Sequence, residues 1–185
     1  MTKARDLSVG IPNGLVLIKP TGATNGTVND SGTVTIGSAV SSVTVSGAFS
    51  ATYDNYKIVV AGGVGSANTN VGLKLGASAT GYYSGAFVIL YSNATSQSVN
   101  DNNATSWTLA VVAAPSGFGT DMTLLNPFLA VRTVISSSRT EVDTAAAAGF
   151  SMGFHNVATS YTAFTLTPAS GTLTGGTISI YGYRK

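Results

Sequence analysis

Glu141 and Asp143 are the pair of residues whose types and spacing come closest to catalytic chemistry. Two residues apart on a strand, their carboxylates would share one face and could bind a cation or a sugar hydroxyl. Hydrolysis of a glycosidic bond also uses two carboxylates, but these lie about 5 to 10 Å apart across a cleft and come from separate segments. The pattern therefore favours a solvated strand face over a catalytic pair.

Other catalytic and metal-binding chemistry has little support in the sequence. His155 is the only histidine, it has no Asp or Glu within ten residues, and the chain has no cysteine. A lone histidine is more often a hydrogen-bonded structural residue than a general base. The oxygen-rich segments "VNDSG" (28–32) and "SVNDNNATS" (98–106) lack the acidic spacing of a calcium loop, so we predict loops with ordinary turn chemistry. We expect no enzymatic activity, no cofactor and no bound metal.

Aromatic residues beside predicted turns offer the best binding surface. A flat ring there could stack on a sugar of a host-surface glycan, and the alternative for each ring is packing in the core or against another subunit. The candidate glycan contacts are Tyr82, Tyr83, Tyr91 and Trp107.

The composition indicates a β protein that assembles with other copies. Only 9% of the residues are charged and Glu occurs once, whereas helix surfaces are normally rich in Glu, Lys and Arg. So few charges leave a free monomer close to its solubility limit, so we expect an oligomer or larger assembly that covers part of the surface. The dispersed charges, net +2, form no basic patch for nucleic acid, and no segment reads as a signal peptide or a membrane span.

Alternating residues predict the strands that position these side chains. Tyr56, Ile58 and Val60 alternate with Lys57 and Val59, and turn signals recur roughly every 8 to 15 residues, as in a sandwich or barrel. We predict an all-β antiparallel β-sandwich, jelly-roll-like, with a short extended N-terminal arm. The predicted parts are a docking arm (1–20) containing a possible edge strand in "LVLIKP", a small-residue strand segment (21–48) that could pair between subunits, and the sandwich domain (49–185).

The chain end predicts a hairpin. Two alternating runs, Tyr161 to Leu166 and Thr177 to Tyr183, flank a turn rich in Pro, Ser and Gly. We expect the last strand to pair with "TAFTLTP" and with a second neighbour. Gly175 and Gly176 would form its turn, and Ile178 and Ile180 would face the same side.

Three segments taken together resemble a C-terminal module of tailed bacteriophage virion proteins, especially tail fibres and related appendages. The segments are "FSATYDNYKIVVAGG", "VGLKLGASATGYYSGAF" and "AFTLTPASGTLTGGTISIYGYRK", within residues 49–185. The opening "MTKARDL" independently resembles the first residues of many marine phage fibre proteins. One difference is that "KLGAS" stands where the family usually has "RFNGD". If the Asp of that family turn binds a ligand or ion, this chain would lack the same contact. The matching positions are Tyr53, Asn55, Tyr56, Leu73, Leu75, Tyr82 or Tyr83, Leu166, Gly171, Gly175, Gly176, Tyr181 and Gly182.

The resemblance implies a β-sandwich, often of jelly-roll type, that is displayed on a virion, often as a homotrimer. The expected role is a short tail fibre or tail appendage that binds the host cell surface, assembled in the host cytoplasm without a signal peptide. A head decoration or capsid fibre protein is the alternative within the virion, and a glycan depolymerase is the alternative from another class. The N-terminal arm would dock onto other virion proteins through Lys3, Arg5, Asp6 and Leu7.

Overall fold

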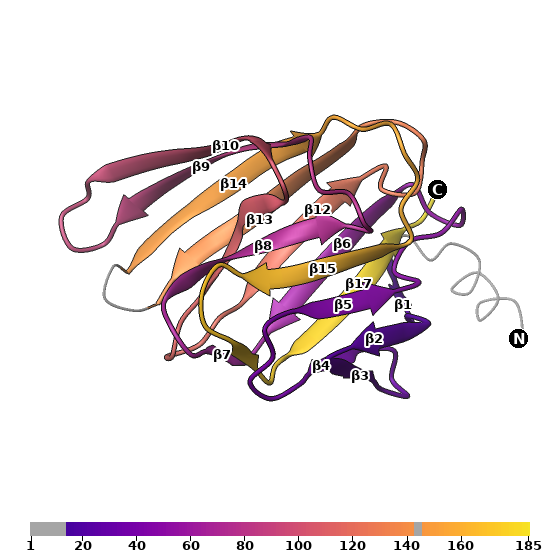
Figure 1. Ribbon diagram of the computed structural model, residues 1–185, viewed down its shortest axis with the longest axis horizontal. Helices are drawn as coiled ribbons and strands as arrows, with labels where there is room; N and C mark the ends of the chain where they lie inside the picture. The colour runs from indigo at the N-terminus through magenta and orange to yellow at the C-terminus, as the bar shows by residue number, and fades with distance from the viewer. Residues whose placement is uncertain (1–13, 143–145) are drawn as a thin grey trace, which may run out of the picture.

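The computed structural model describes residues 14–142 and 146–185, which form two antiparallel sheets packed face to face (Figure 1). Alternation decides which side of each strand is buried: Tyr56, Ile58 and Val60 lie fully in the core, while Lys57 and Val59 point outward and are half-buried. The predicted all-β antiparallel sandwich is confirmed.

Among the described residues, the larger sheet has ten strands. Its order is β10 (Ser96–Ala104), β9 (Tyr82–Leu90), β14 (Ala147–His155), β13 (Thr133–Glu141), β12 (Thr120–Leu125), β6 (Asn55–Ala61), β17 (Thr177–Tyr183), β4 (Val34–Ile36) and β3 (Gly26–Val28), with β1 (Leu15–Ile18) also paired with β17. The β9–β10 hairpin forms one end of the long axis, whereas β1 and the C-terminus lie at the opposite end (Figure 1).

The smaller sheet, which has five strands within the described part of the chain, covers the inner face of the larger one. Its order is β11 (Trp107–Ala113), β8 (Thr69–Leu75), β15 (Ala163–Pro168), β5 (Val43–Ser46) and β2 (Gly22–Thr24), and β7 (Val64–Gly65) pairs separately with β16 (Leu173–Thr174). In the described part of the chain, no helix is long and apolar enough to cross a membrane.

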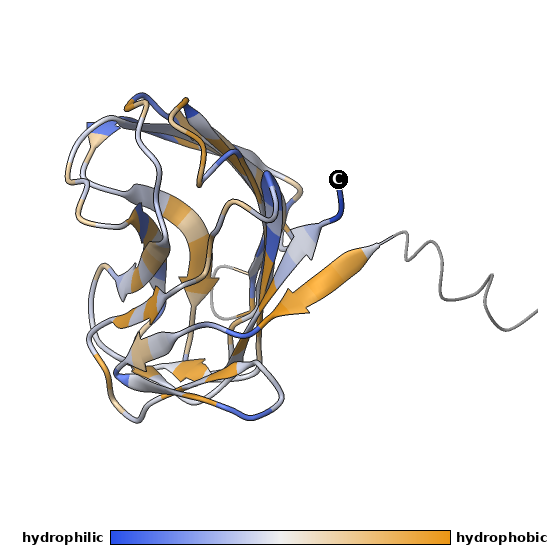
Figure 2. Cartoon of the chain, turned by 90° about the vertical axis from the view of Figure 1, so that its right-hand side faces the viewer, coloured by the Kyte–Doolittle hydropathy of each residue, from blue (hydrophilic) through white to orange (hydrophobic). Residues whose placement is uncertain are grey.

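A single core fills the space between the sheets. Figure 2 shows the layers from the side, with β1 as a hydrophobic strand beside the C-terminal strand. The largest fully buried side chains come from both sheets and from the segments that join them: Trp107, Tyr56, Tyr82, Phe49, Phe164, Ile58, Leu73, Leu75, Met122, Leu124, Leu166 and Leu173.

The small-residue segment 21–48 contributes strands to both sheets. β4 pairs with β17 and β3 in the larger sheet, and β5 pairs with β15 and β2 in the smaller one. Val34, Ile36, Val43 and Val45 alternate as predicted and are all buried. These short strands therefore obtain their pairing within the chain.

The predicted C-terminal hairpin is wrong. β15 belongs to the smaller sheet, between β5 and β8, whereas β17 lies in the larger sheet between β6 on one side and β4 and β1 on the other. The connection crosses from one sheet to the other through β16, so the two strands are not neighbours. Ile178 and Ile180 are both buried, as expected of residues on one face.

The predicted glycine turn before β17 is present. Gly175 and Gly176 have φ of 66° and 84°, in the region that glycine adopts without a steric penalty. A Cβ at Gly176 would overlap the carbonyl oxygen of Gly62, so the backbones can approach here only because a side chain is missing. Gly176 thus allows the turn before β17 to pack closely against the residue that follows β6.

Candidate functional site

Tyr82 and Trp107, two of the four aromatic candidates, lie in the core, so neither ring is open to a glycan. The exposed fractions are 0% for Tyr82 and 1% for Trp107, and the rings meet edge to face with centroids 5.1 Å apart. The Tyr82 hydroxyl accepts a hydrogen bond from the Leu75 backbone N–H at 2.8 Å, and burial raises the pKa of Tyr82 to about 12. The prediction of glycan contact is wrong for these two, and the packing alternative explains them.

His155 belongs to the same buried aromatic cluster. The Thr80 carbonyl oxygen, which can only accept, lies 3.0 Å from Nε2 and therefore places the proton on that nitrogen. Nδ1 then accepts the Tyr161 hydroxyl at 3.4 Å, and Ser78 Oγ lies 2.9 Å from Nε2. Burial lowers the pKa of His155, which favours the neutral ring. These contacts tie β14 to the turn before β9, as a structural histidine would.

Glu141 forms an ion pair with its neighbour on the strand. Arg139, 6% exposed, places Nη2 3.0 Å from Glu141 Oε1 and 2.6 Å from Asn70 Oδ1, while Nη1 donates to the Leu109 carbonyl at 3.3 Å. The guanidinium thus joins β13 to β8 and β11 across the sandwich. Asp143 lies outside the described residues, so its pairing with Glu141 stays a prediction.

The two oxygen-rich segments differ in structure. Residues 29–32 form a turn, as predicted, and Val28 ends β3. Residues 98–104 belong to β10, so the loop expected there is wrong. Asp101 on β10 accepts hydrogen bonds from Ser84 Oγ at 2.6 Å and from the Thr108 backbone N–H at 2.8 Å, which joins β9, β10 and β11. Among the described residues, no group of three or more His, Asp or Glu side chains could hold a metal ion.

The two remaining tyrosines differ in accessibility. Tyr83 is half-buried on the outer face of the ten-stranded sheet and stacks on Phe154, with centroids 5.0 Å apart and ring planes 9° apart. Tyr91 follows β9 at the hairpin end of the molecule and is 61% exposed. Of the four candidates, Tyr91 therefore offers the most open ring. The docking candidates Lys3, Arg5, Asp6 and Leu7 lie outside the described residues.

The outer face of the larger sheet carries an apolar area that was not predicted from the sequence. On β14, Phe150, Met152 and Phe154 point away from the core, and Phe87 of β9 lies directly opposite Phe150 in the register. We call these four residues the apolar ridge. Its signal was present in the sequence, because β9 and β14 carry large apolar residues at the positions that a half-buried strand normally leaves polar.

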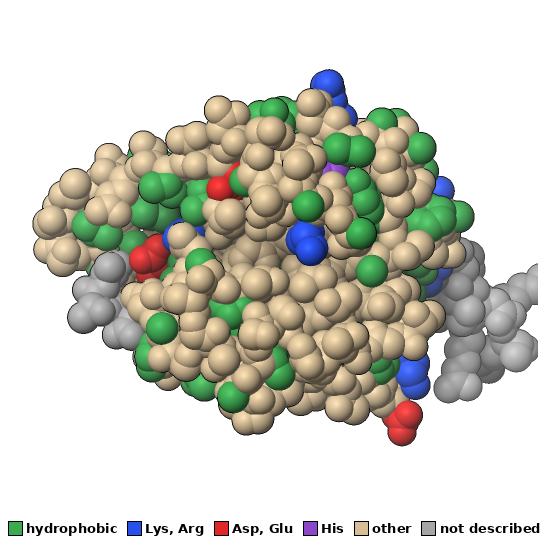
Figure 3. All heavy atoms as spheres, in the orientation of Figure 1, with side chains coloured by type: hydrophobic (Ala, Val, Ile, Leu, Met, Phe, Trp, Pro, Cys, Tyr) green, Lys and Arg blue, Asp and Glu red, His purple; other side chains and the backbone are tan. Residues whose placement is uncertain are grey.

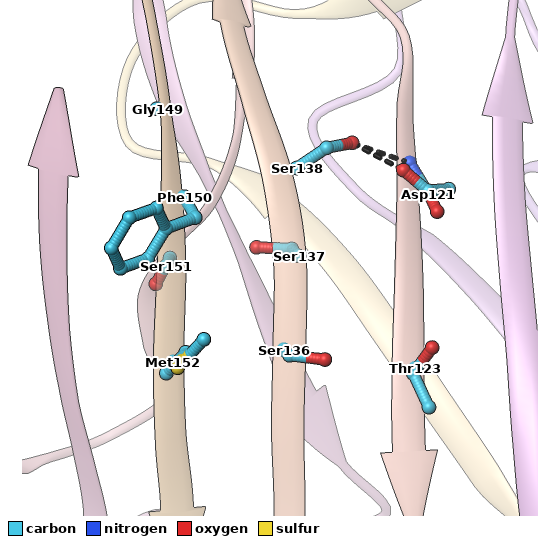
Figure 4. Close-up of a pocket in the computed structure, with 9 residues that line it drawn as sticks. All are labelled: Asp121, Thr123, Ser136, Ser137, Ser138, Gly149, Phe150, Ser151 and Met152. Carbon is cyan, nitrogen blue, oxygen red and sulfur yellow. Dashed lines mark hydrogen bonds between the residues drawn. The ribbon is translucent and has the colours of Figure 1, made fainter. Parts of the chain in front are cut away.

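A groove of about 290 Å³ lies beside the ridge (Figure 4). Phe150 and Met152 line one side, and the short side chains of Thr123, Ser136 and Ser138 leave the space above β12 and β13 open. We call it the outer groove. By contrast, the face seen in Figure 3 shows only small, scattered areas of hydrophobic side chains and few charged groups.

An ion pair closes the far edge of the outer groove. Asp121 Oδ2 lies 2.9 Å from Lys57 Nζ, and Asp121 also accepts a hydrogen bond from the Ser138 hydroxyl. The Ser138 hydrogen bond and Lys57 hold the pKa of Asp121 below its usual value, and Asp121 raises the pKa of Lys57. The two charges therefore neutralise each other and leave no unpaired charge at this edge.

No family model matches the chain, and no curated protein matches it.

Proposed function

We propose that this protein is a non-enzymatic structural component of a phage virion, a short tail fibre or tail appendage that attaches to the host cell surface. The antiparallel sandwich is the fold that the resemblance to phage appendage modules implies. The proposed form is a homotrimer assembled in the host cytoplasm, with residues of the N-terminal arm docked onto other virion proteins.

The observation that carries this proposal is the apolar ridge. Phe150 is 48% exposed and Met152 is 57% exposed on the outer face of a sheet whose inner face already contains the core. Large contiguous apolar patches on soluble proteins mark surfaces that another molecule covers. A subunit of a virion appendage requires such a surface, and the low charge of the chain favours the same assembly.

The two ends of the long axis suit two different contacts. β1, which belongs to the proposed docking arm (1–20), lies at one end, and the β9–β10 hairpin with Tyr91 lies at the other (Figure 1). In an appendage mounted through its N-terminal end, this hairpin would point toward the host. We propose that the Tyr91 ring stacks on a sugar of a host-surface glycan.

Adsorption competition tests the attachment role. Purified wild-type protein should slow the adsorption of the phage to its host, and Tyr91→Ala should lose most of this effect. Tyr183→Ala is the matched control, since Tyr183 is also exposed but lies on β17 at the opposite end. Equal competition by wild type and Tyr91→Ala would remove Tyr91 from the attachment site.

Imaging of the virion at a resolution that traces this chain distinguishes a position on the tail from a position on the head. Density for the chain on the tail supports the tail appendage, and density on the head supports the second candidate, a head decoration or capsid fibre protein.

The third candidate, a glycan depolymerase, would lose polysaccharide degradation in the Glu141→Gln/Asp143→Ala variant. The ion pair between Arg139 and Glu141 speaks against it, because that carboxylate is already engaged.

A further inference from the structure

We propose that the outer face of β9, β12, β13 and β14 is the contact surface between copies of this chain, with the apolar ridge of one copy seated in the outer groove of the next. This inference rests on the proposed function, in which the chain works as an oligomer. It adds the surface and the way in which two copies fit.

The strand register makes the ridge continuous. Phe150 lies opposite Phe87 and Phe154 lies opposite Tyr83, so aromatic side chains form two cross-strand pairs on β9 and β14. Met152, opposite Gly85, lies between these two pairs. At one end the apolar surface continues across two further strands, because Val134 on β13 lies opposite Phe154 and Leu125 on β12 lies opposite Val134. The apolar surface thus spans four strands of one sheet face.

The exposed apolar area is of the size that the centre of an interface needs. Each of seven apolar side chains on this face is between 38% and 57% exposed: Phe87, Ile89, Leu125, Val134, Phe150, Met152 and Phe154. With roughly 200 Å² for a large side chain, they expose on the order of 500 Å² of mainly apolar surface. A standard interface buries about 800 Å² on each partner, and its centre is the apolar part.

The ridge and the outer groove complement each other in shape. The groove volume is about 290 Å³, and a cavity of about 150 Å³ already admits a benzene ring. A Phe side chain of another copy therefore fits above Ser136 and Ser138. Because the ridge and the groove lie side by side on the same face, each copy offers both halves of the contact, as a closed homo-oligomer requires.

Charge and hydrogen bonding favour a second copy over a glycan as the partner of the apolar ridge. Phe87, Phe150, Met152 and Phe154 carry neither charge nor a side-chain N–H or O–H that could bind sugar hydroxyls. The nearby charges of Lys57 and Asp121 neutralise each other. With a net charge of +2, two copies repel each other only weakly.

The first test removes the ridge. In sedimentation experiments on the full chain, Phe150→Thr/Met152→Thr should weaken self-association by about tenfold or more for each side chain. Thr suits a strand, so circular dichroism should stay unchanged. The control is Val99→Thr: Val99 is 52% exposed on β10 but lies opposite Ala86, whose side chain points inward, so self-association should stay as in wild type.

The second test fills the groove. Ser136→Phe adds apolar surface to this face but occupies the space that receives the ridge. Ridge-in-groove packing predicts weaker self-association, by about tenfold or more. Stronger self-association would mean that the face is merely adhesive and would overturn the proposed fit.

Cross-linking gives a direct readout, because the chain has no cysteine of its own. Met152→Cys and Ser136→Cys proteins carrying different tags should form a mixed disulfide when they are combined and treated with a mild added oxidant, which accepts the two electrons of the thiols. Val99→Cys should not form a disulfide with either protein under the same conditions. Absence of the mixed disulfide in an oligomeric preparation would overturn the fit.

The outcomes separate this inference from the proposed function. An oligomer that neither the ridge nor the groove variants affect overturns the contact surface and leaves the appendage role standing. A wild-type chain that stays monomeric at all concentrations overturns the contact surface and the proposed oligomer together. A monomer that binds host glycan through Phe150 overturns the contact surface while it supports host attachment.

Discussion

Replacement of Tyr82 by Phe tests whether this tyrosine is a structural part of the core. The substitution keeps the ring that packs against Trp107 and removes only the hydroxyl that accepts the Leu75 N–H at 2.8 Å. That N–H would remain buried without its partner, and a buried unpaired group costs about 1–3 kcal/mol. We therefore expect Tyr82→Phe to lower the free energy of unfolding by about 1–3 kcal/mol.

Urea unfolding at a fixed protein concentration measures this change, because association would otherwise shift the midpoint. For a chain of this length each kcal/mol corresponds to about 2–4 °C in Tm. Tyr91→Phe is the control: Tyr91 is 61% exposed, and its stability should stay within about 0.5 kcal/mol of wild type. The reasoning fails if Tyr82→Phe unfolds like wild type, or if it loses competition for host adsorption while its stability is unchanged.

Three further perturbations test the other contacts. Gly176→Ala should lower the free energy of unfolding by about 2 kcal/mol or more, because φ is 84° and a Cβ would overlap the Gly62 carbonyl. Gly85→Ala is the control and should be tolerated, since no atom lies within 4 Å of the added Cβ. Burial lowers the pKa of His155 in the folded protein, so the unfolded chain binds the His155 proton more tightly. Urea unfolding measured from pH 7 to pH 5 should therefore show the free energy of unfolding falling below about pH 6.5, by at most about 1.4 kcal/mol per pH unit. His155→Gln should remove this slope. Arg139→Met should destabilise the protein by about 3–5 kcal/mol in urea, since it leaves Glu141 without its ion-pair partner, while Arg132→Met on the exposed surface should have little effect.

The strand content followed from local patterns. Tyr56, Ile58 and Val60 share a buried face because strand side chains alternate, and this holds whatever the neighbouring strand is. The same reasoning missed β10, whose segment "SVNDNNATS" has turn-forming residues and no buried face of its own. Pairing with β9 makes it a strand, so its neighbour overrides its local preference.

The candidate site was less accessible to sequence reasoning. Tyr82 and Tyr83 are adjacent in the sequence, yet one lies in the core and the other on the outer face, since neighbouring side chains on a strand point to opposite sides. The rule says that the two differ, and it does not say which one is inside. The outer groove depends on three strands lying side by side, an arrangement that no single segment encodes.

The sequence by itself determined the all-β fold class of this protein through its short alternating strands, and it determined the low charge and the absence of cysteine. It also determined that Ile178 and Ile180 share a face, because that property belongs to one strand. Only the tertiary structure decided that β15 and β17 lie in different sheets and that Phe87 meets Phe150 on an outer face. The physical reason is that a period of two orients side chains within a strand, whereas the choice of neighbour depends on how the whole chain crosses between the sheets.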